Sequence, residues 1–241
     1  MDKYLEFEQD GIKYNLYDMP DGFVIKGDLL LRFKCLEELP DLSKVIVEGT
    51  FWCCDNKLKS LKGCPKEVGG AFNCSSNQLT SLEGAPQKVG GSFSCEWNQL
   101  TSLKGAPRKI GGGMYVKVNK LENLEGAPEV IGGDFNCTAN QELEDLKDIP
   151  QMKPDGKIIC PRQIVDKYGL SSWEIEAREL YDNPVYQQEL KNSGKIRELK
   201  RRINPSGEFM TRAEEDAKRQ AKHKAGFAAF KKKFGPKERE E

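Results

Sequence analysis

Hydrophobic positions recur at an interval of about twenty-one residues through the middle of the chain. In residues 71–91 the pattern consists of Phe72, Cys74, Asn77, Leu79 and Leu82. The same pattern starts again at four other positions, which are Phe51, Phe93, Met114 and Phe135, with one residue inserted in the last copy. A constant period of this length predicts a solenoid in which each repeat stacks on the next.

Two degenerate copies flank these five. Residues 25–31 match residues 47–53 at a spacing of twenty-two, and residues 156–160 resemble the strand part of a further copy, with Gln163 in the asparagine position. The sequence therefore predicts about seven repeats over residues 25–160. The terminal copies are expected to be atypical, because each has only one neighbour to pack against.

Within a repeat, residues 72–74 alternate between apolar and polar side chains and predict a short strand with Phe72 and Cys74 pointing inward. Stacked copies of this strand make a parallel sheet. Asn77 follows the strand, where its side-chain amide can bond backbone groups of the bend. The pair Gly90-Gly91 is expected to let the backbone bend tightly into the next strand.

The flanking regions predict caps and an appendage. Residues 1–24 alternate apolar side chains and carry a Pro-Asp-Gly turn, which indicates a hairpin-like N-terminal cap. Residues 161–203 predict short helices over 161–168, 172–182 and 184–203, with Ser172 as an N-cap. Residues 204–241 predict a linker and a basic helix, opened by a capping box at residues 211–214. The expected fold class is an α/β-type repeat solenoid with these additions.

The repeat, Phe-x-Cys-x-x-Asn-x-Leu-x-x-Leu, resembles the leucine-rich repeat, with aromatic residues and cysteine in two of the leucine positions. Its short period and its proline in each turn are similar to the compact type in bacterial effector proteins. The Gly-Ala-Pro and Val-Gly-Gly segments are similar to repeat proteins encoded by tailed bacteriophages and their hosts. The resemblance implies a protein-binding solenoid. Some effectors of this type carry a ubiquitin-ligase domain with a Cys-x-Asp motif, but Pro161 and Arg162 follow Cys160 here.

The cysteines and the charge balance exclude several classes. Lysine plus arginine equal aspartate plus glutamate at 38 each, so net charge indicates no partner. Five of the eight cysteines occupy one repeat position that Val116 and Leu31 fill elsewhere, which favours buried packing over disulfides. There is no CxxC pair and His223 is the only histidine, so we expect no metal and no cofactor. The acidic start and the absence of a long apolar run favour a cytoplasmic protein, in a host cell or a virion, with no membrane segment.

Candidate binding residues stand on the outward, concave face of the predicted sheet, where they depart from the small polar residues of the other copies. They are Trp52, Glu96, Trp97, Tyr115 and Lys117. Exposed aromatic residues beside charges are typical of protein-binding hot spots. The alternative is that Trp97 packs on its own solenoid and that Tyr115 is ordinary surface.

The C-terminal segment is locally basic, with fourteen lysines and arginines against five acidic residues between Lys191 and Gly235. Its possible contact residues are Lys218, Arg219, Lys222, Phe227, Phe230 and Lys231. Basic side chains among aromatic ones can meet the phosphates of nucleic acid. The alternatives are a helix that docks through its alanine stripe and plain solvated surface.

The sequence as a whole predicts a non-enzymatic protein-binding module, because it offers no nucleophile–base pair and no acid cluster outside the repeats. The partner is expected to be another protein, bound on the concave face, with the basic tail as a second contact and no small-molecule substrate. One alternative is a virion or assembly component anchored by its C-terminal helix. The other is a nucleic-acid-associated protein that acts through the basic tail.

Overall fold

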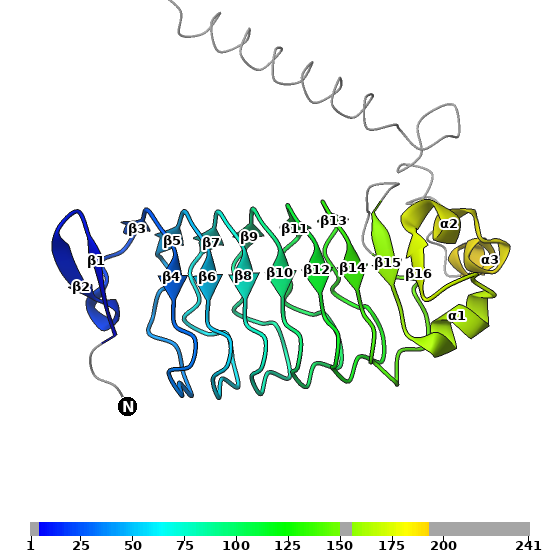
Figure 1. The fold of residues 1–241 in the computed structure, drawn as a ribbon, viewed down its shortest axis with the longest axis horizontal. Helices are drawn as coiled ribbons and strands as arrows, with labels where there is room; N and C mark the ends of the chain where they lie inside the picture. Colours follow the sequence, from blue (N-terminus) through cyan, green and yellow to red (C-terminus); the bar gives the residue numbers. More distant parts are fainter. Residues whose placement is uncertain (1–4, 150–155, 193–241) are drawn as a thin grey trace, which may run out of the picture. The chain divides into compact units, whose positions relative to one another are not determined.

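The computed structural model describes residues 5–149 and 156–192, which belong to one compact unit. Most of this unit is a parallel β-solenoid of about six turns with a period near 21 residues (Figure 1). A small hairpin precedes the solenoid and three short helices follow it. The predicted helix in residues 204–241 lies outside the described residues.

Each coil contributes one strand to an eight-stranded sheet, which we call the long sheet. Its strands are β4 (Leu29–Leu30), β6 (Phe51–Trp52), β8 (Phe72–Asn73), β10 (Phe93–Ser94), β12 (Met114–Tyr115), β14 (Phe135–Asn136), β15 (Lys157–Ile159) and β16 (Glu174–Glu176). The first seven pair in parallel, with equivalent residues of neighbouring coils opposite one another. The strands from β4 to β15 lie where the repeat pattern predicts them.

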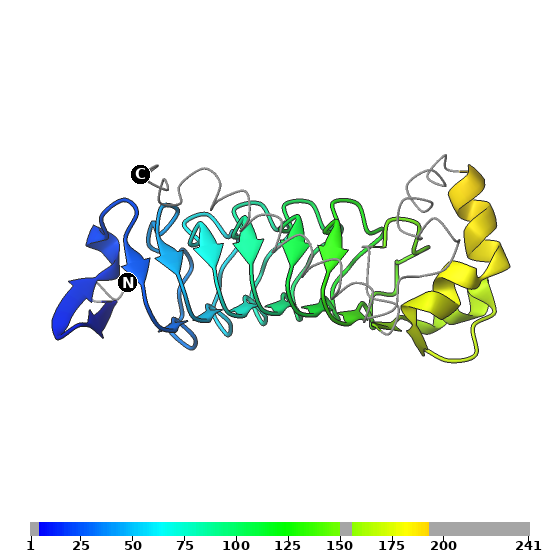
Figure 2. The same cartoon turned by 90° about the horizontal axis from the view of Figure 1, so that it is seen from above.

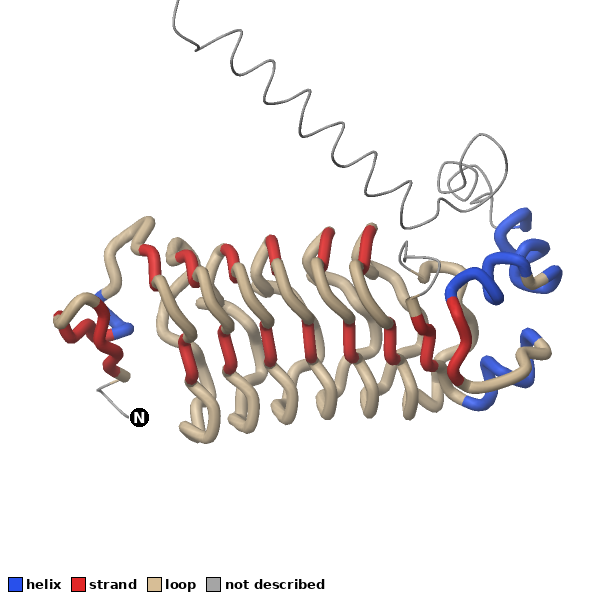
Figure 3. Tube along the Cα trace, turned by 45° about the horizontal axis from the view of Figure 1, so that its top comes forward, coloured by secondary structure: helices blue, strands red, loops and turns tan. Residues whose placement is uncertain are grey.

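A second row of strands, which we call the short sheet, runs along the solenoid beside the first (Figures 1 and 2). It contains β3 (Val24–Ile25), β5 (Ile46–Val47), β7 (Glu67–Val68), β9 (Lys88–Val89), β11 (Lys109–Ile110) and β13 (Val130–Ile131). The α/β designation does not describe these coils, because their described residues contain strands and turns and no helix (Figure 3). Only three residues lie between Pro86 and Gly90. This length is enough for a two-residue strand but too short for a helix.

The core is built from columns of identical or similar side chains. Phe51, Phe72 and Phe93 are fully buried, and the ring centroids of the last two are 5.0 Å apart. The cysteine position is buried in each coil, whether it holds Cys95 or Val116. Its predicted role as an apolar packing position is confirmed.

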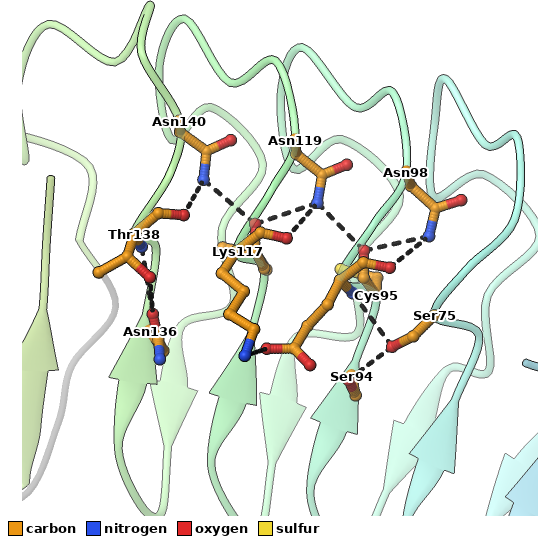
Figure 4. Close-up of polar contacts among 11 residues, drawn as sticks. Ser75, Ser94, Cys95, Asn98, Lys117, Asn119, Asn136, Thr138 and Asn140 are labelled. Carbon is orange, nitrogen blue, oxygen red and sulfur yellow. Dashed lines mark hydrogen bonds and ion pairs between the residues drawn. The ribbon is translucent and has the colours of Figure 1, made fainter.

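An asparagine ladder joins consecutive coils (Figure 4). The Nδ2 of Asn98 donates to the carbonyls of Cys95 in its own coil and Cys74 in the preceding coil, both at 3.1 Å. Its Oδ1 accepts from the amide of Leu79 at 2.9 Å. Asn77, Asn119 and Asn140 repeat the same arrangement. The predicted bonding of the bend is confirmed, and the same amide also ties each coil to the one before it.

The glycine pair Gly90-Gly91 bends the chain between β9 and β10 as predicted, and it also lets neighbouring coils approach closely. A Cβ on Gly90 would lie 2.1 Å from the carbonyl oxygen of Gly69 in the preceding coil. The coils therefore approach too closely for any side chain at this position. Gly84, in the outer turn, has a left-handed backbone with φ of 88°, which glycine adopts without strain.

The N-terminal hairpin, predicted from residues 1–24, consists of β1 (Glu6–Gln9) and β2 (Ile12–Asn15), followed by a 3₁₀ turn at Leu16–Asp18. Gln9 connects the hairpin to the short sheet. Its Nε2 donates to the carbonyl of Val24 at 3.1 Å, and its Oε1 accepts from the amide of Lys26 at 2.8 Å. One side chain thus makes on β3 the pair of bonds that another strand would make.

Residues 162–192 follow the last coil at the other end of the solenoid. Helix α1 (Arg162–Tyr168) is present as predicted, and α3 (Pro184–Asn192) covers the described part of the third predicted helix. The second predicted helix is wrong in its first half: β16 pairs antiparallel with β15, and only α2 (Ala177–Asp182) is helical. Ser172 is not an N-cap, because its hydroxyl accepts from the amide of Glu174 and leads into β16. The predicted boundary between the second and third helices, at residue 183, is confirmed, since Asn183 ends α2 and its Oδ1 accepts from the amides of Val185 and Tyr186 in α3.

Candidate functional site

The face predicted to bind a partner is the outer face of the long sheet. One residue of each strand points outward, in register from coil to coil: Leu30, Trp52, Asn73, Ser94, Tyr115, Asn136 and Ile159. These side chains are exposed or half-buried, whereas the inward residues beside them are buried. The variable residues are therefore the ones that solvent or a partner can reach.

Trp97 is the most prominent predicted residue on this face. Its side chain is 58% exposed, so it does not pack extensively on its own solenoid. Its φ of 56° lies in the left-handed region, which bulky side chains seldom adopt. Each coil from β4 to β14 places a non-glycine residue in this conformation at the same position, and these residues are Phe33, Asp55, Ser76, Trp97, Val118 and Ala139. The backbone therefore presents this column outward in each turn.

Tyr115 lies in the next coil and folds back over its own strand. A Cβ on Gly113 would lie 2.8 Å from the tyrosine oxygen and 3.0 Å from Cζ. Other coils carry Ala71 or Ser92 where this one has Gly113, so the glycine makes room for the ring. Tyr115 is half-buried.

Glu96 and Lys117 occupy equivalent positions in the same two coils, and their charges meet. Lys117 Nζ lies 3.5 Å from Glu96 Oε1 (Figure 4). Both side chains are partly exposed, so the pair adds at most about 1 kcal/mol to stability. We call Glu96, Trp97, Tyr115 and Lys117 the central group, because the structure brings these four predicted residues together.

Trp52 stands apart from the central group, two coils before Trp97. At about 4.8 Å for each coil, the separation is roughly 10 Å. Its neighbour is Arg32, whose guanidinium carbon lies 5.1 Å from the Trp52 ring centroid and 5.9 Å from that of Phe33. The column after the cysteine position is more buried than expected, since Cys54 and Ser75 in it are buried.

Sequence reasoning missed Leu30, Arg32 and Phe33, which surround Trp52 at the start of the face. Leu30 is 46% exposed and Phe33 is 69% exposed. These three residues belong to the degenerate first copy, outside the five clear copies that define the outward columns. Extending them to the first copy, at its spacing of twenty-two, would have placed Arg32 and Phe33 beside the other outward residues.

A cavity of about 620 Å³ lies at the far end of the face, between the last coil and α1. Ala139, Gln163 and Trp173 are among the residues that line it, and Trp173 is 57% exposed. Gln163 continues the asparagine ladder, because its Nε2 donates to the carbonyl of Asn140 at 2.8 Å. The cavity is lined by the end of the solenoid, by α1 and by the segment that leads into β16.

The buried cysteine thiols are unreactive. Burial raises the pKa of Cys54 to about 12 and that of Cys160 to about 11, and it also raises the pKa of Cys95. These thiols stay protonated at neutral pH and are poor nucleophiles and ligands. All eight cysteines are free, and the described residues contain no group of three side chains able to hold a metal ion. The predicted tail contacts, from Lys218 to Lys231, lie outside the described residues.

Comparisons with known proteins place no relative beside this chain: no family model, no curated protein and no solved structure matches it. Among the helices of the described residues, none has the length and apolar character needed to cross a membrane.

Proposed function

We propose that this protein is a non-enzymatic protein-binding module that recognises a macromolecular partner on the outer face of the long sheet. The observation that carries the proposal is Trp97, a large aromatic side chain that is more than half exposed and held in a left-handed backbone conformation. The equivalent residues of the other coils share this conformation, so the fold requires it here, but it is unfavourable for a tryptophan. A requirement outside the fold accounts for its presence.

The surroundings of Trp97 support a protein partner. Tyr115 is half-buried and its ring lies over Gly113, so a tyrosine anchor here has less side-chain freedom to lose on binding than a fully exposed one. The ion pair of Glu96 and Lys117 supplies both signs of charge beside the two rings. Rigid aromatic residues with adjacent charges are the usual composition of interface hot spots.

The type of repeat and the origin of the protein are part of the proposal. The sequence of the repeat and the asparagine that bonds each bend favour a leucine-rich-repeat-like solenoid of the bacterial and bacteriophage kind. Such a protein acts in the cytoplasm or in a virion. The basic segment after residue 204 serves as a second contact.

The experiment is an affinity capture from the native host or infected cell. Three versions of the protein serve as bait: the parent, Trp173→Ala and Trp97→Ala. The parent protein and Trp173→Ala should retain the same partner, because Trp173 is equally exposed but lies beyond the last coil, at the far end of the face from the central group. Trp97→Ala should weaken binding of that partner by about 2 kcal/mol or more, roughly a thirtyfold rise in Kd. Equal capture by all three baits would refute the proposal.

Truncation at Asn204 separates the two other functions that the sequence allows. An assembly component anchored by its C-terminal helix, or a protein that binds nucleic acid through its tail, would lose its partner on truncation. Nucleic-acid binding would also weaken steeply with salt, because neutralised phosphates release counterions. Binding that survives truncation but not Trp97→Ala supports the module proposed here.

A further inference from the structure

The long sheet ends in two edge strands, and each of them pairs with one neighbour: β16 with β15, and β4 with β6. The edge at β4 lies beside the N-terminal hairpin (Figure 1). The hairpin strands β1 and β2 pair only with each other. An edge strand of this kind can receive another extended chain.

The backbone of β4 offers hydrogen-bonding groups at this edge. The amide of Leu29 donates to the carbonyl of Thr50 at 2.8 Å. The amide of Leu31 donates to the carbonyl of Trp52 at 2.7 Å. Peptide groups alternate along a parallel ladder, so the N–H and C=O of Leu30 point away from β6. Within the described residues, no backbone hydrogen bond reaches these two groups of Leu30.

The neighbouring edge of the short sheet shows what a closed edge looks like in this protein. There, the side chain of Gln9 bonds both Val24 and Lys26 and takes the place of a further strand on β3. The two edges at the same end of the solenoid are thus treated differently. One is closed by a side chain, and the other exposes its peptide groups.

Apolar side chains border the open edge. Leu30 is 46% exposed, and Phe33, three residues later, is 69% exposed. Phe33 also has a left-handed φ of 56°, which is unfavourable for a phenylalanine. These side chains gain from being covered, and the described residues do not cover them.

Positive charge without a carboxylate partner lies beside the same edge. The guanidinium of Arg32 rests against the rings of Trp52 and Phe33. Among the ion pairs of residues 5–149 and 156–192, none includes Arg32 or Lys34. A guanidinium that is stacked on aromatic rings keeps its donors available for bidentate binding of a carboxylate.

We infer that the edge of β4 is a strand-addition site for an extended, acidic peptide segment of a partner protein. The segment bonds the peptide groups of Leu30, places a carboxylate on Arg32 and covers Phe33 with an apolar side chain. This site goes beyond the proposed function, because it uses the first coil and shares no residue with the central group.

A second copy of the chain fits this edge less well. Antiparallel pairing of two β4 strands about Leu30 would set Arg32 of one copy opposite Asp28 of the other. However, Asp28 Oδ1 accepts a hydrogen bond from the amide of Thr50 at 2.7 Å, so this carboxylate is already turned toward its own coil. A partner segment with its own free carboxylates meets the charge requirement better.

The test uses synthetic octapeptides and the full-length protein. A peptide that alternates valine and glutamate should bind, and it should protect the Leu30 amide from hydrogen exchange. Arg32→Gln should weaken this binding at least about fivefold, as expected for a charge-assisted hydrogen bond. The matched control is Arg108→Gln, because Arg108 is exposed, paired with Glu129 and remote from β4. It should bind as the parent does.

Three results would overturn the inference. The first is equal binding of a valine–lysine peptide, and the second is equal binding of a valine–glutamate peptide with a methylated backbone. The third is concentration-dependent dimerisation that Leu30→Pro abolishes while thermal unfolding stays unchanged, which would assign the edge to a second copy. Trp97→Ala should leave peptide binding intact, so failure here and failure of the proposed function are distinguishable.

Discussion

Trp97 and Asn98 are adjacent in the chain, yet opposite requirements determine the two positions. The asparagine position holds the same residue in all five clear copies, and in Asn98 its side chain is nearly buried and hydrogen-bonded to two coils. The position before it holds aspartate, serine, tryptophan, valine or alanine, all with nearly the same φ. The asparagine position therefore stabilises the backbone of the coil, whereas the position before it accepts side chains of different kinds. Variation beside an invariant bonding residue marks the side chains that are free to recognise a partner.

Replacing the ladder residue should have the largest effect on stability. Asn98→Ala leaves the buried amide of Leu79 without an acceptor and the carbonyls of Cys74 and Cys95 without this donor. The expected loss is about 3 kcal/mol or more of unfolding free energy. Urea unfolding measures it, with the exposed Gln99→Ala as the control that should stay within about 0.5 kcal/mol. Equal midpoints for the two variants would contradict the role given to the ladder.

Alkaline pH should reveal the buried cysteine column. Burial raises the pKa of Cys95 above its ordinary value of 9.0, so above that pH the unfolded chain releases a proton that the folded protein keeps. The contribution of this thiol to stability is complete below pH 9 and falls as pH rises, by up to about 1.4 kcal/mol per pH unit.

Cys95→Val tests this dependence, because Val116 fills the same position in the next coil. At pH 7 the variant should match the parent within about 1.5 kcal/mol. Between pH 9 and 11, urea unfolding should show the variant losing less stability than the parent. Parallel curves over this range would show that the thiol is not buried as described.

A substitution in the column of residues with left-handed φ should have a smaller effect on stability, and it should stabilise the protein rather than destabilise it. Val118 has a φ of 54°, a conformation that asparagine adopts more readily than a β-branched residue. Val118→Asn should therefore stabilise the protein, by about 0.5–1 kcal/mol. Thermal unfolding measures the gain. The same substitution at Val116, which is fully buried, should destabilise the protein by several kcal/mol; a loss at both positions would contradict the assignment of the column.

The fold was predictable where one residue recurred at a fixed place. Phe72 and Cys74 predicted the long sheet, and Asn77 predicted the bonded bend. The short sheet was not predicted, because a two-residue strand with Val89 as its single buried residue has no periodicity of its own. The stretch after Ser172 was mistaken for a helix because pairing with β15, a tertiary contact, overrides local helix propensity.

The candidate site was predictable only in part, for a similar reason. Glu96, Trp97, Tyr115 and Lys117 depart from a repeat that is otherwise regular, and the structure brings them together. Arg32 and Phe33 belong to a degenerate terminal copy, and they join the outward columns only when that copy is aligned at its spacing of twenty-two. Their importance comes from the open edge of β4, which depends on how the hairpin bonds β3 rather than on the repeat itself.

The most direct test of the central claim is Trp97→Asn, measured for both unfolding free energy and affinity for the captured partner. Asparagine suits the left-handed backbone, so the variant should be at least as stable as the parent while its Kd rises roughly thirtyfold or more. A variant that is destabilised by more than about 1 kcal/mol and still binds normally would contradict the account. Trp97 would then be a structural residue, and the outer face would not be the binding surface.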